Sequence, residues 1–250
     1  MRLAGLLVLT LVLTLGLAGL VWLGQRHAVF GWARAGWPPT AAEVTPPAYL
    51  AAARARPPRT ITFFGASNYA RSPVLTPLAE ALSACAGAPV TVRAVARAGA
   101  NSDWGMGQLD AALSGTDILV VGFSGNDASL WRGLPIARSV ANHEAIVRAA
   151  QARGVMVFLS GGGGSSTGIR GVNRLIRPGL PDYTIRDGAE LARRTGVARV
   201  PDNPARDALS PAEQRALMPD GLHATPEAVL RFSLPVYLEM LRPLVCPAPD

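Results

Sequence analysis

From residue 60 onward, short apolar runs alternate with longer segments in which apolar residues recur every three or four positions. The runs are continuous and rich in β-branched and aromatic residues, which is typical of strands buried on both faces of a parallel sheet. They lie at residues 60–64, 90–95, 117–123, 155–159 and 197–200. The pattern therefore predicts a five-stranded parallel sheet.

The segments between these strands predict helices that cover the sheet. Their expected positions are residues 73–84, 103–113, 138–153, 186–194 and 225–244. The last helix has a clear start, because Thr225 can cap it, Pro226 suits its first turn and Glu227 lies near the positive end of its dipole. Strands that alternate with helices indicate an α/β fold with helices on both faces of the sheet.

The N-terminal segment from Leu3 to Gly24 is almost wholly apolar, and only Thr10 and Thr14 interrupt it. About 20 apolar residues span a bilayer, whereas the apolar core of a cleavable signal peptide has roughly 7–15 residues. We therefore expect residues 1–25 to form an uncleaved transmembrane signal-anchor, with a cleaved signal peptide and secretion as the alternative. The flanking charges specify the orientation poorly. The expected arrangement is a single-pass inner-membrane protein with a periplasmic domain.

A proline-rich stretch follows this apolar segment. Residues 36–59 contain six prolines, which favour a semi-extended spacer over a packed element. The folded part then begins close to Thr60, at the first predicted strand. The predicted organisation is an anchor at 1–25, a Pro-rich linker at 26–59 and a folded domain at 60–250.

The composition argues against some classes of function. The net charge is +7 and all 24 basic residues are arginine, but these are scattered, and no nucleic-acid-binding motif is present. The two cysteines and three histidines show no spacing that is typical of a zinc site. We therefore expect neither a nucleic acid nor a metal as a partner. The sequence leaves the oligomeric state open.

The first predicted strand runs into Gly65-Ala66-Ser67, where small residues allow a sharp turn and present a hydroxyl. Ligands bind at the carboxyl edge of an open α/β sheet, and Ser67 lies at that edge. Ser67 is either a nucleophile or a serine that only caps the following helix. A nucleophilic serine needs a base, so the choice depends on the histidines.

His223 is the best candidate for that base. His27 lies beside the N-terminal apolar segment, and His143 lies in the middle of a predicted helix, where a solvated position is expected. His223 lies in a loop before the last helix, and Asp220 precedes it by three residues, so that the carboxylate can orient the imidazole. The spacing Asp-x-x-His is a weak indication by itself, since it often arises by chance.

Two further strand ends offer donors for an oxyanion. Gly99 follows the second strand and could direct a backbone N–H toward the site, and Asn126 follows the third and could donate from its amide. Each is compatible with an ordinary turn when taken alone. What favours function is that a nucleophile, two donors and an acid–base pair all fall at one edge of the sheet.

The irregular segment Gly161–Tyr183 follows the fourth strand, so it should border the same edge as Ser67. It is either a substrate-binding lid or a surface excursion. Its glycine run is not a phosphate-binding P-loop, because no Gly-Lys-Ser or Gly-Lys-Thr follows. Three arginines in it could hold an acidic sugar or a phosphate, namely Arg170, Arg174 and Arg177.

In their order along residues 60 to 244, these motifs resemble those of the SGNH (GDSL-type) hydrolases. The matching segments are Gly65-Ala66-Ser67 for the family's Gly-Asp-Ser, Gly99 for its second-block glycine, Ser124-Gly125-Asn126-Asp127 for Gly-x-Asn-Asp, and Asp220-Gly221-Leu222-His223 for Asp-x-x-His. Ala66 departs from the family's Asp, and Ser124 departs from its Gly. Neither change removes a proposed catalytic atom.

The resemblance implies a flavodoxin-like three-layer α/β/α sandwich, which agrees with the strand pattern. It also implies a serine esterase without a cofactor, with Ser67, His223 and Asp220 as the triad. The N–H groups of Ser67 and Gly99 and the Asn126 side chain would form the oxyanion hole. The expected substrates are acetyl or other short acyl esters of cell-envelope or exported carbohydrate. The alternatives are an O-acyltransferase with the same triad, a lipid esterase, and a catalytically silent carbohydrate-binding or assembly protein.

The implied fold also bears on the two cysteines. In a flavodoxin-like order, the first and last helices of the domain cover the same face and end at the edge opposite the active site. Cys85 follows the first of these helices and Cys246 follows the last. We therefore expect a Cys85–Cys246 disulfide, with two unpaired thiols as the alternative. A disulfide would place the domain in an oxidising compartment.

Overall fold

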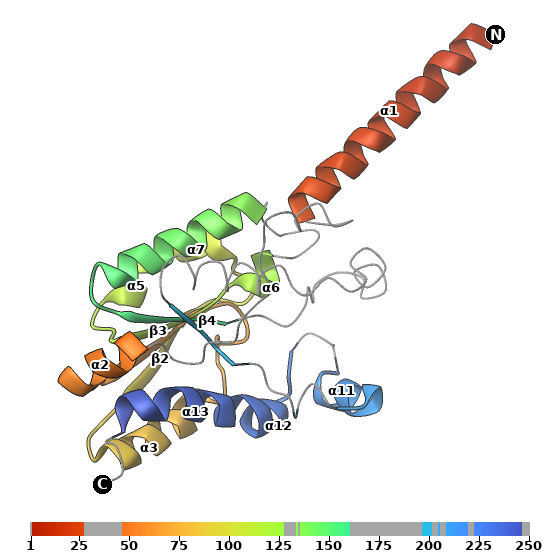
Figure 1. Cartoon of the computed structure of the whole chain (residues 1–250). Helices are drawn as coiled ribbons and strands as arrows, with labels where there is room; N and C mark the ends of the chain where they lie inside the picture. The colour runs from red at the N-terminus through yellow and green to blue at the C-terminus, as the bar shows by residue number, and fades with distance from the viewer. Residues whose placement is uncertain are drawn as a thin grey trace.

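A computed structural model of the chain describes residues 2–27, 47–127, 134, 136–160, 197–201, 205, 209–219 and 223–246. Its centre is a five-stranded sheet in which all neighbours are parallel, with the order β2-β1-β3-β4-β5 (Figure 1). The strands are β1 (Thr60–Gly65), β2 (Thr91–Ala96), β3 (Ile118–Gly122), β4 (Met156–Leu159) and β5 (Ala198–Arg199). This order is that of flavodoxin, and the predicted fold class is confirmed.

Each face of the sheet carries its own hydrophobic core, because consecutive strand side chains point to opposite faces. Phe63 belongs to one core and Phe64 to the other. The first core is covered by α2 (Pro47–Ala55), α3 (Leu75–Ala86) and α13 (Leu234–Val245). The second is covered by α4 (Ser102–Met106), α5 (Leu109–Leu113) and α7 (Ile136–Gln151). Figure 1 shows these helices on opposite sides of the sheet, which makes the expected three-layer sandwich.

Two predicted helices are divided in the structure. The helix expected at 103–113 is two short helices, α4 and α5. The break contains Gly107, and glycine has a low helix propensity. The helix expected at 225–244 starts at the Thr225 cap as α12 (Pro226–Ala228) and widens into a π-helical segment, η2 (Val229–Ser233), before α13. Pro235 explains the wider turn, because it has no N–H to donate within the helix.

Helix α2 shows that the folded part begins before Thr60. The expected linker at 26–59 is helical from Pro47 to Ala55 and packs against the first core and α13. The Tyr49 hydroxyl donates to the Val157 carbonyl over 3.0 Å and accepts from the Val157 N–H over 2.9 Å. Burial raises the pKa of Tyr49 to about 12, although its bond to the Val157 backbone opposes this, so the hydroxyl stays neutral. A short Ala-rich helix thus joins the domain through one buried tyrosine.

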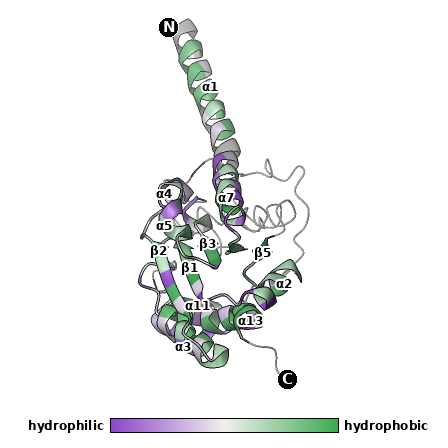
Figure 2. Cartoon of the chain, turned by 90° about the vertical axis from the view of Figure 1, so that its left-hand side faces the viewer, coloured by the Kyte–Doolittle hydropathy of each residue, from purple (hydrophilic) through white to green (hydrophobic). Residues whose placement is uncertain are grey.

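Helix α1 (Arg2–His27) coincides with the N-terminal apolar segment. Its large apolar side chains between Leu7 and Trp22 are exposed, and Figure 2 colours most residues of this helix as hydrophobic. Among the described residues, however, no helix combines the length and the apolarity that a membrane crossing requires. The anchor expected at residues 1–25 therefore has no support here and stays a prediction.

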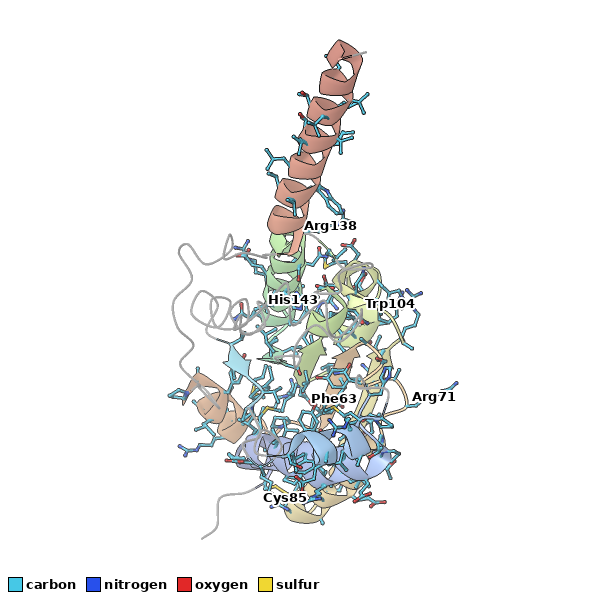
Figure 3. All side chains as sticks on the ribbon, turned by 90° about the vertical axis from the view of Figure 1, so that its right-hand side faces the viewer. Phe63, Arg71, Cys85, Trp104, Arg138 and His143 are labelled. Carbon is cyan, nitrogen blue, oxygen red and sulfur yellow. A yellow bond between two sulfur atoms is a disulfide. The ribbon has the colours of Figure 1, made fainter. Side chains whose placement is uncertain are left out.

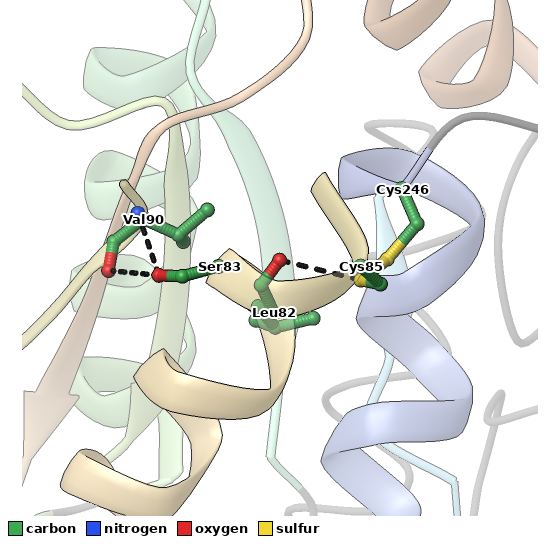
Figure 4. The surroundings of a disulfide bond; sticks show 5 residues. All are labelled: Leu82, Ser83, Cys85, Val90 and Cys246. Atoms are coloured by element: carbon green, nitrogen blue, oxygen red, sulfur yellow. Dashed lines mark hydrogen bonds between the residues drawn. A yellow bond between two sulfur atoms is a disulfide. The ribbon is translucent and has the colours of Figure 1, made fainter. Parts of the chain in front are cut away.

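Cys85 and Cys246 form a disulfide, with their Cα atoms 5.3 Å apart (Figure 4). Cys85 lies in the last turn of α3 and Cys246 follows α13, and these two helices pack together on the first core. Ser83 precedes Cys85 by two residues in α3. Its hydroxyl accepts a hydrogen bond from the N–H of Val90, which lies just before β2 begins. The disulfide thus lies at the amino edge of the sheet.

Candidate active site

Three neighbouring strands end at the same level and bring three loops side by side. Gly65 of β1 is in register with Ala96 of β2 on one side and with Gly122 of β3 on the other. Beyond the register, the Arg97 N–H donates to the Gly65 carbonyl and the Ala66 N–H donates to the Gly122 carbonyl, both over 3.2 Å. The residues that follow β1, β2 and β3 are therefore held next to one another.

Ser67 lies in a tight turn directly after β1. The Ala66 carbonyl accepts hydrogen bonds from the N–H groups of Tyr69 and Ala70, each over 3.1 Å. The backbone from Ala66 to Ala70 therefore forms a single helical turn. Ala66 itself is buried, whereas Ser67 is only partly covered. With Ala at position 66, the turn is held by main-chain bonds and by the packing of its neighbours.

Tyr69 is the main packing residue of this turn, and sequence analysis missed it. Its ring is 1% exposed and packs edge-on against Phe63, with ring centroids 5.0 Å apart. A Cβ added at Gly65 or Gly122 would come within 2.7 Å of this ring. The paired glycines at the ends of β1 and β3 make the space that Tyr69 fills, so the pairing of Gly65 with Gly122 was the signal that could have revealed it.

Burial dominates the electrostatics of Tyr69. It raises the pKa of the phenol, and the hydroxyls of Ser160 and Tyr237 and the side chain of Asn68 oppose this only partly. Tyr69 therefore stays neutral and supports the turn by packing.

The structure brings the predicted nucleophile and base together. The Oγ of Ser67 and the Nε2 of His223 lie 3.0 Å apart, within hydrogen-bonding distance. His223 lies at the surface, just before α12. The third predicted member of the triad, Asp220, lies outside the described residues. The pair alone meets the geometric requirement for general-base activation of a serine.

Gly99 lies in the turn that follows β2, next to the strand end that leads to Ser67. The Ala100 N–H donates to the Arg97 carbonyl over 3.0 Å, and Gly99 adopts φ +75°, a left-handed conformation that strongly favours glycine. Among the described residues, no protein acceptor takes a hydrogen bond from the N–H of Ser67 or of Gly99.

Asn126 joins the third strand end to the second. Its Nδ2 donates to the Ala100 carbonyl over 2.7 Å. Because an amide carries two hydrogens, the other N–H can still be offered to a ligand. The bond fixes the Asn126 amide beside the Gly99 turn, so the predicted side-chain donor and the predicted backbone donor are held together.

The remaining predicted residues have different outcomes. Arg170, Arg174 and Arg177 lie outside the described residues, and their expected role stays a prediction. His143 was expected on a solvated helix face, but this was wrong: it is buried, and its Nδ1 lies 2.8 Å from the Ser139 carbonyl. Within the described part of the chain, no group of His, Cys, Asp and Glu side chains could hold a metal ion.

Comparisons with known proteins bear on the fold. No family model and no curated protein matches the chain, but solved structures do. A lipase/acylhydrolase from Enterococcus faecalis is 24% identical, with a TM-score of 0.55 over 74% of this chain and 96% of its own. The acetylxylan esterase Axe2 from Geobacillus stearothermophilus is 14% identical, with a TM-score of 0.57 over 73% of this chain and 94% of its own. The chain has the SGNH hydrolase fold. A psychrotrophic esterase from Pseudoalteromonas sp., EstA, shares this SGNH fold at 18% identity, with a TM-score of 0.56 over 74% of this chain and 97% of its own.

The predicted site residues follow the strand ends that the sequence pattern indicated. Ser67 follows β1, Gly99 follows β2 and Asn126 follows β3, all at the carboxyl edge of the sheet. His223 reaches the same edge from the far end of the sequence.

Proposed function

We propose that the protein is a serine ester hydrolase in which Ser67 is the nucleophile and His223 is the general base. The observation that carries this proposal is the 3.0 Å distance between the Ser67 Oγ and the His223 Nε2. The SGNH fold supports it, because the structures that share this fold include a lipase/acylhydrolase, a GDSL-like lipase and an acetylxylan esterase. No cofactor enters the proposed reaction.

The reaction would proceed in two halves. In the first, the Ser67 proton passes to the His223 Nε2 as the Ser67 Oγ forms a bond to the acyl carbon. The ester C–O bond then breaks, and the leaving alkoxide takes the proton from His223, which leaves an acyl-enzyme. In the second half, His223 takes a proton from water as the water oxygen forms a bond to the acyl carbon. The bond between the acyl carbon and the Ser67 Oγ then breaks, the Ser67 Oγ takes the proton back from His223, and the carboxylic acid is released. Asp220 would orient His223.

The negative charge of each tetrahedral intermediate would be held by three donors. These are the backbone N–H groups of Ser67 and Gly99 and the free N–H of the Asn126 amide. Two observations support this assignment, namely the left-handed conformation of Gly99 and the 2.7 Å hydrogen bond from the Asn126 amide to the Ala100 carbonyl. Donors fixed before the reaction stabilise an oxyanion without reorganisation, which is their main contribution to rate.

The proposed substrates are acetyl or other short acyl esters on cell-envelope or exported carbohydrate. The acetylxylan esterase among the similar structures supports the acyl group and the carbohydrate class. Arg170, Arg174 and Arg177 would contact an acidic sugar or a phosphate of such a substrate. An O-acyltransferase would use the same residues with a sugar hydroxyl in place of water, and analysis of the products with an added acceptor separates the two activities.

We also propose that the domain works outside the cytoplasm. The Cys85–Cys246 disulfide supports this placement, because disulfides persist in oxidising compartments. The single-pass inner-membrane anchor remains a prediction of the sequence. Membrane fractionation of the full chain, with protease protection of intact cells and spheroplasts, tests both points together.

The test of the function compares the full chain with its Ser67→Ala variant. Wild type should hydrolyse a short-chain aryl ester. An aryl ester of ethyl phosphonate should phosphonylate the Ser67 Oγ with loss of the phenolate, and mass spectrometry of the digested protein should detect one label at Ser67. Ser67→Ala should lose both. Ser83→Ala is the control, because Ser83 lies at the opposite edge of the sheet beside Val90. Equal hydrolysis by wild type and Ser67→Ala would overturn the proposal.

A further inference from the structure

The carboxylate of Asp127 lies directly behind the site and has no role in the reaction described above. Asp127 is 0% exposed and follows Asn126, the proposed oxyanion donor. Its Oδ1 accepts from the Ser102 N–H over 2.7 Å, and its Oδ2 accepts from the hydroxyls of Ser102 and Ser139 over 2.6 and 2.7 Å. A buried carboxylate is costly unless hydrogen bonds compensate it, and here three donors converge on it.

These donors come from two helices of the same layer. Ser102 is the first residue of α4, and Ser139 lies in the first turns of α7. Asn142, one turn further along α7, donates to the Ser102 Oγ over 3.0 Å and to Asp103 over 2.7 Å. Asp127 and Asn142 therefore tie α4 to α7 next to the carboxyl edge of the sheet.

The buried His143 completes this cluster. Its Nδ1 lies 2.8 Å from the Ser139 carbonyl and 3.8 Å from the Asp127 Oδ2. Figure 3 shows His143 and Arg138 on α7, with Trp104 of α4 nearby. The surface ion pair of Arg138 with Asp103, 2.7 Å apart, adds a further link between the two helices. The polar groups around Asp127 thus form one connected network.

Two consecutive residues hold the Gly99 loop from the same side. Asn126 holds Ala100 through its side-chain amide, and Asp127 holds Ser102 through both the backbone and the hydroxyl. The loop therefore has two fixed points, both just after Gly99. If the second were released, α4 could shift, and the Gly99 N–H would move relative to the Asn126 amide.

We propose that Asp127 is a positioning residue for the oxyanion hole. It fixes the start of α4 and thereby the distance between the two donors, Gly99 and Asn126. This inference rests on the proposed esterase function. Asp127 does not touch substrate, because it is fully buried. Its carboxylate suits the role because it accepts at both oxygens, whereas an amide of the same shape would turn an NH2 group toward one of the donors.

The test is the kinetic analysis of Asp127→Asn in the full chain, with a neutral short-chain aryl ester. We expect kcat to fall by about 10–100-fold, the effect of a small misplacement of catalytic groups, while KM changes by less than about threefold. The rate of phosphonate labelling at Ser67 should fall in parallel with kcat, because that reaction also builds negative charge in the oxyanion hole.

Thr62→Val is the matched control for a loss of buried polar contacts. Thr62 is 0% exposed, and its Oγ1 lies 2.7 Å from the Thr116 Oγ1 and 3.0 Å from the Arg93 Nε, in a network near the other end of β1. Thr62→Val should lower Tm without lowering kcat. If Asp127→Asn lowers Tm and leaves kcat at the wild-type value, or if both variants lose kcat equally, the proposal is overturned.

Two further measurements keep the test decisive. Should Asp127→Asn fail to fold, Ser139→Ala removes one donor from the same carboxylate, and a smaller fall in kcat at unchanged KM is expected.

In the Asn126→Ala background, Asp127→Asn should lower kcat by a smaller factor than in wild type, since one of the positioned donors is already gone. Full additivity of the two effects on kcat contradicts the proposal. Failure of the esterase function itself would look different, because wild type would then neither hydrolyse the ester nor take the phosphonate.

Discussion

The Ser67 Oγ and the His223 Nε2 lie 3.0 Å apart although 156 positions separate them in the sequence. Ser67 is held by the turn that follows β1. His223 is held from the other side, because the Thr225 N–H donates to the Leu217 carbonyl over 2.8 Å and Thr225 caps the last helix. The contact therefore depends on the packing of the last helix against the first core.

The first prediction concerns His223→Ala. Without a base, Ser67 keeps its proton, so kcat should fall by about 10³-fold or more. The double variant Ser67→Ala/His223→Ala should be no slower than the slower single variant, because the two residues act as one unit. Steady-state kinetics on the aryl ester measure both. A double variant whose loss is the product of the single losses would argue against a shared step.

The second prediction concerns Asn126→Ala. This variant removes an oxyanion donor and the bond to Ala100, so kcat should fall by about 10²–10³-fold while Ser67 and His223 remain intact. Gln108→Ala is the control, since it removes a side-chain amide that donates to the Gly107 carbonyl and holds no strand-end loop in the described part of the chain. A normal kcat for Asn126→Ala would remove Asn126 from the oxyanion hole.

The strands and the strand-end residues could be predicted because their signal is local. A continuous apolar run such as β3 marks a buried strand wherever it lies, and parallel strands place their following residues at one edge. Ser67, Gly99 and Asn126 each follow such a run directly. Their common location is therefore a consequence of the strand order, which the family resemblance implied.

What the sequence did not reveal depends on contacts between distant positions. Helix α2 looked like linker because it lies among prolines, and its place in the domain rests on Tyr49 reaching Val157, 108 positions away. His143 looked solvated because its neighbours in the helix are polar. Instead, His143 and Ser139 of the same helix turn toward the buried Asp127, which no local pattern indicates.

The third prediction concerns Gly122→Ala. The added Cβ would lie 2.6 Å from the ring of Tyr69, which is 1% exposed and packs against Phe63. We expect a loss of about 1–3 kcal/mol in the free energy of unfolding and a lower kcat, since Tyr69 packs the Ser67 turn. Gly107→Ala is the control, because its Cβ would meet only the Trp104 carbonyl at 3.5 Å and its φ is −72°. Equal stability of the two variants would contradict this account of Tyr69.

The fourth prediction concerns the disulfide. Replacing both Cys85 and Cys246 by Ser should lower the free energy of unfolding by roughly 4–5 kcal/mol, since the bridge closes a loop of 161 residues in the unfolded chain. The kcat of the folded double variant should stay at the wild-type value, because the bridge lies at the edge opposite Ser67. Urea unfolding with and without a reductant measures the first effect. The double variant, which has no bridge to reduce, serves as the control.

The fifth prediction concerns pH and Asp117, which links α2 to the start of β1. Its Oδ2 accepts from the N–H groups of Arg59 and Thr60 over 2.8 and 2.9 Å, and its Oδ1 pairs with Arg56 at 2.6 Å. Burial pushes the pKa of Asp117 upward, but these bonds and the Arg56 charge outweigh burial and lower it overall. A carboxylate whose pKa is lowered by folding stabilises the protein above its unfolded pKa of about 3.9, and the stabilisation is lost as the pH falls through the folded value.

Asp117→Asn should therefore cost about 1–3 kcal/mol of stability at neutral pH, the usual value for hydrogen bonds to a charged group. The difference between this variant and wild type should shrink as the pH falls below about 4, because wild type then loses the same charge. Asp110→Asn is the control. Asp110 pairs with Arg153 on the surface and is 91% exposed, so its loss should be small at every pH. Urea unfolding of the three proteins across this pH range measures the effect, and a difference for Asp117→Asn that persists unchanged in acid would show that its carboxylate charge is not what stabilises the link.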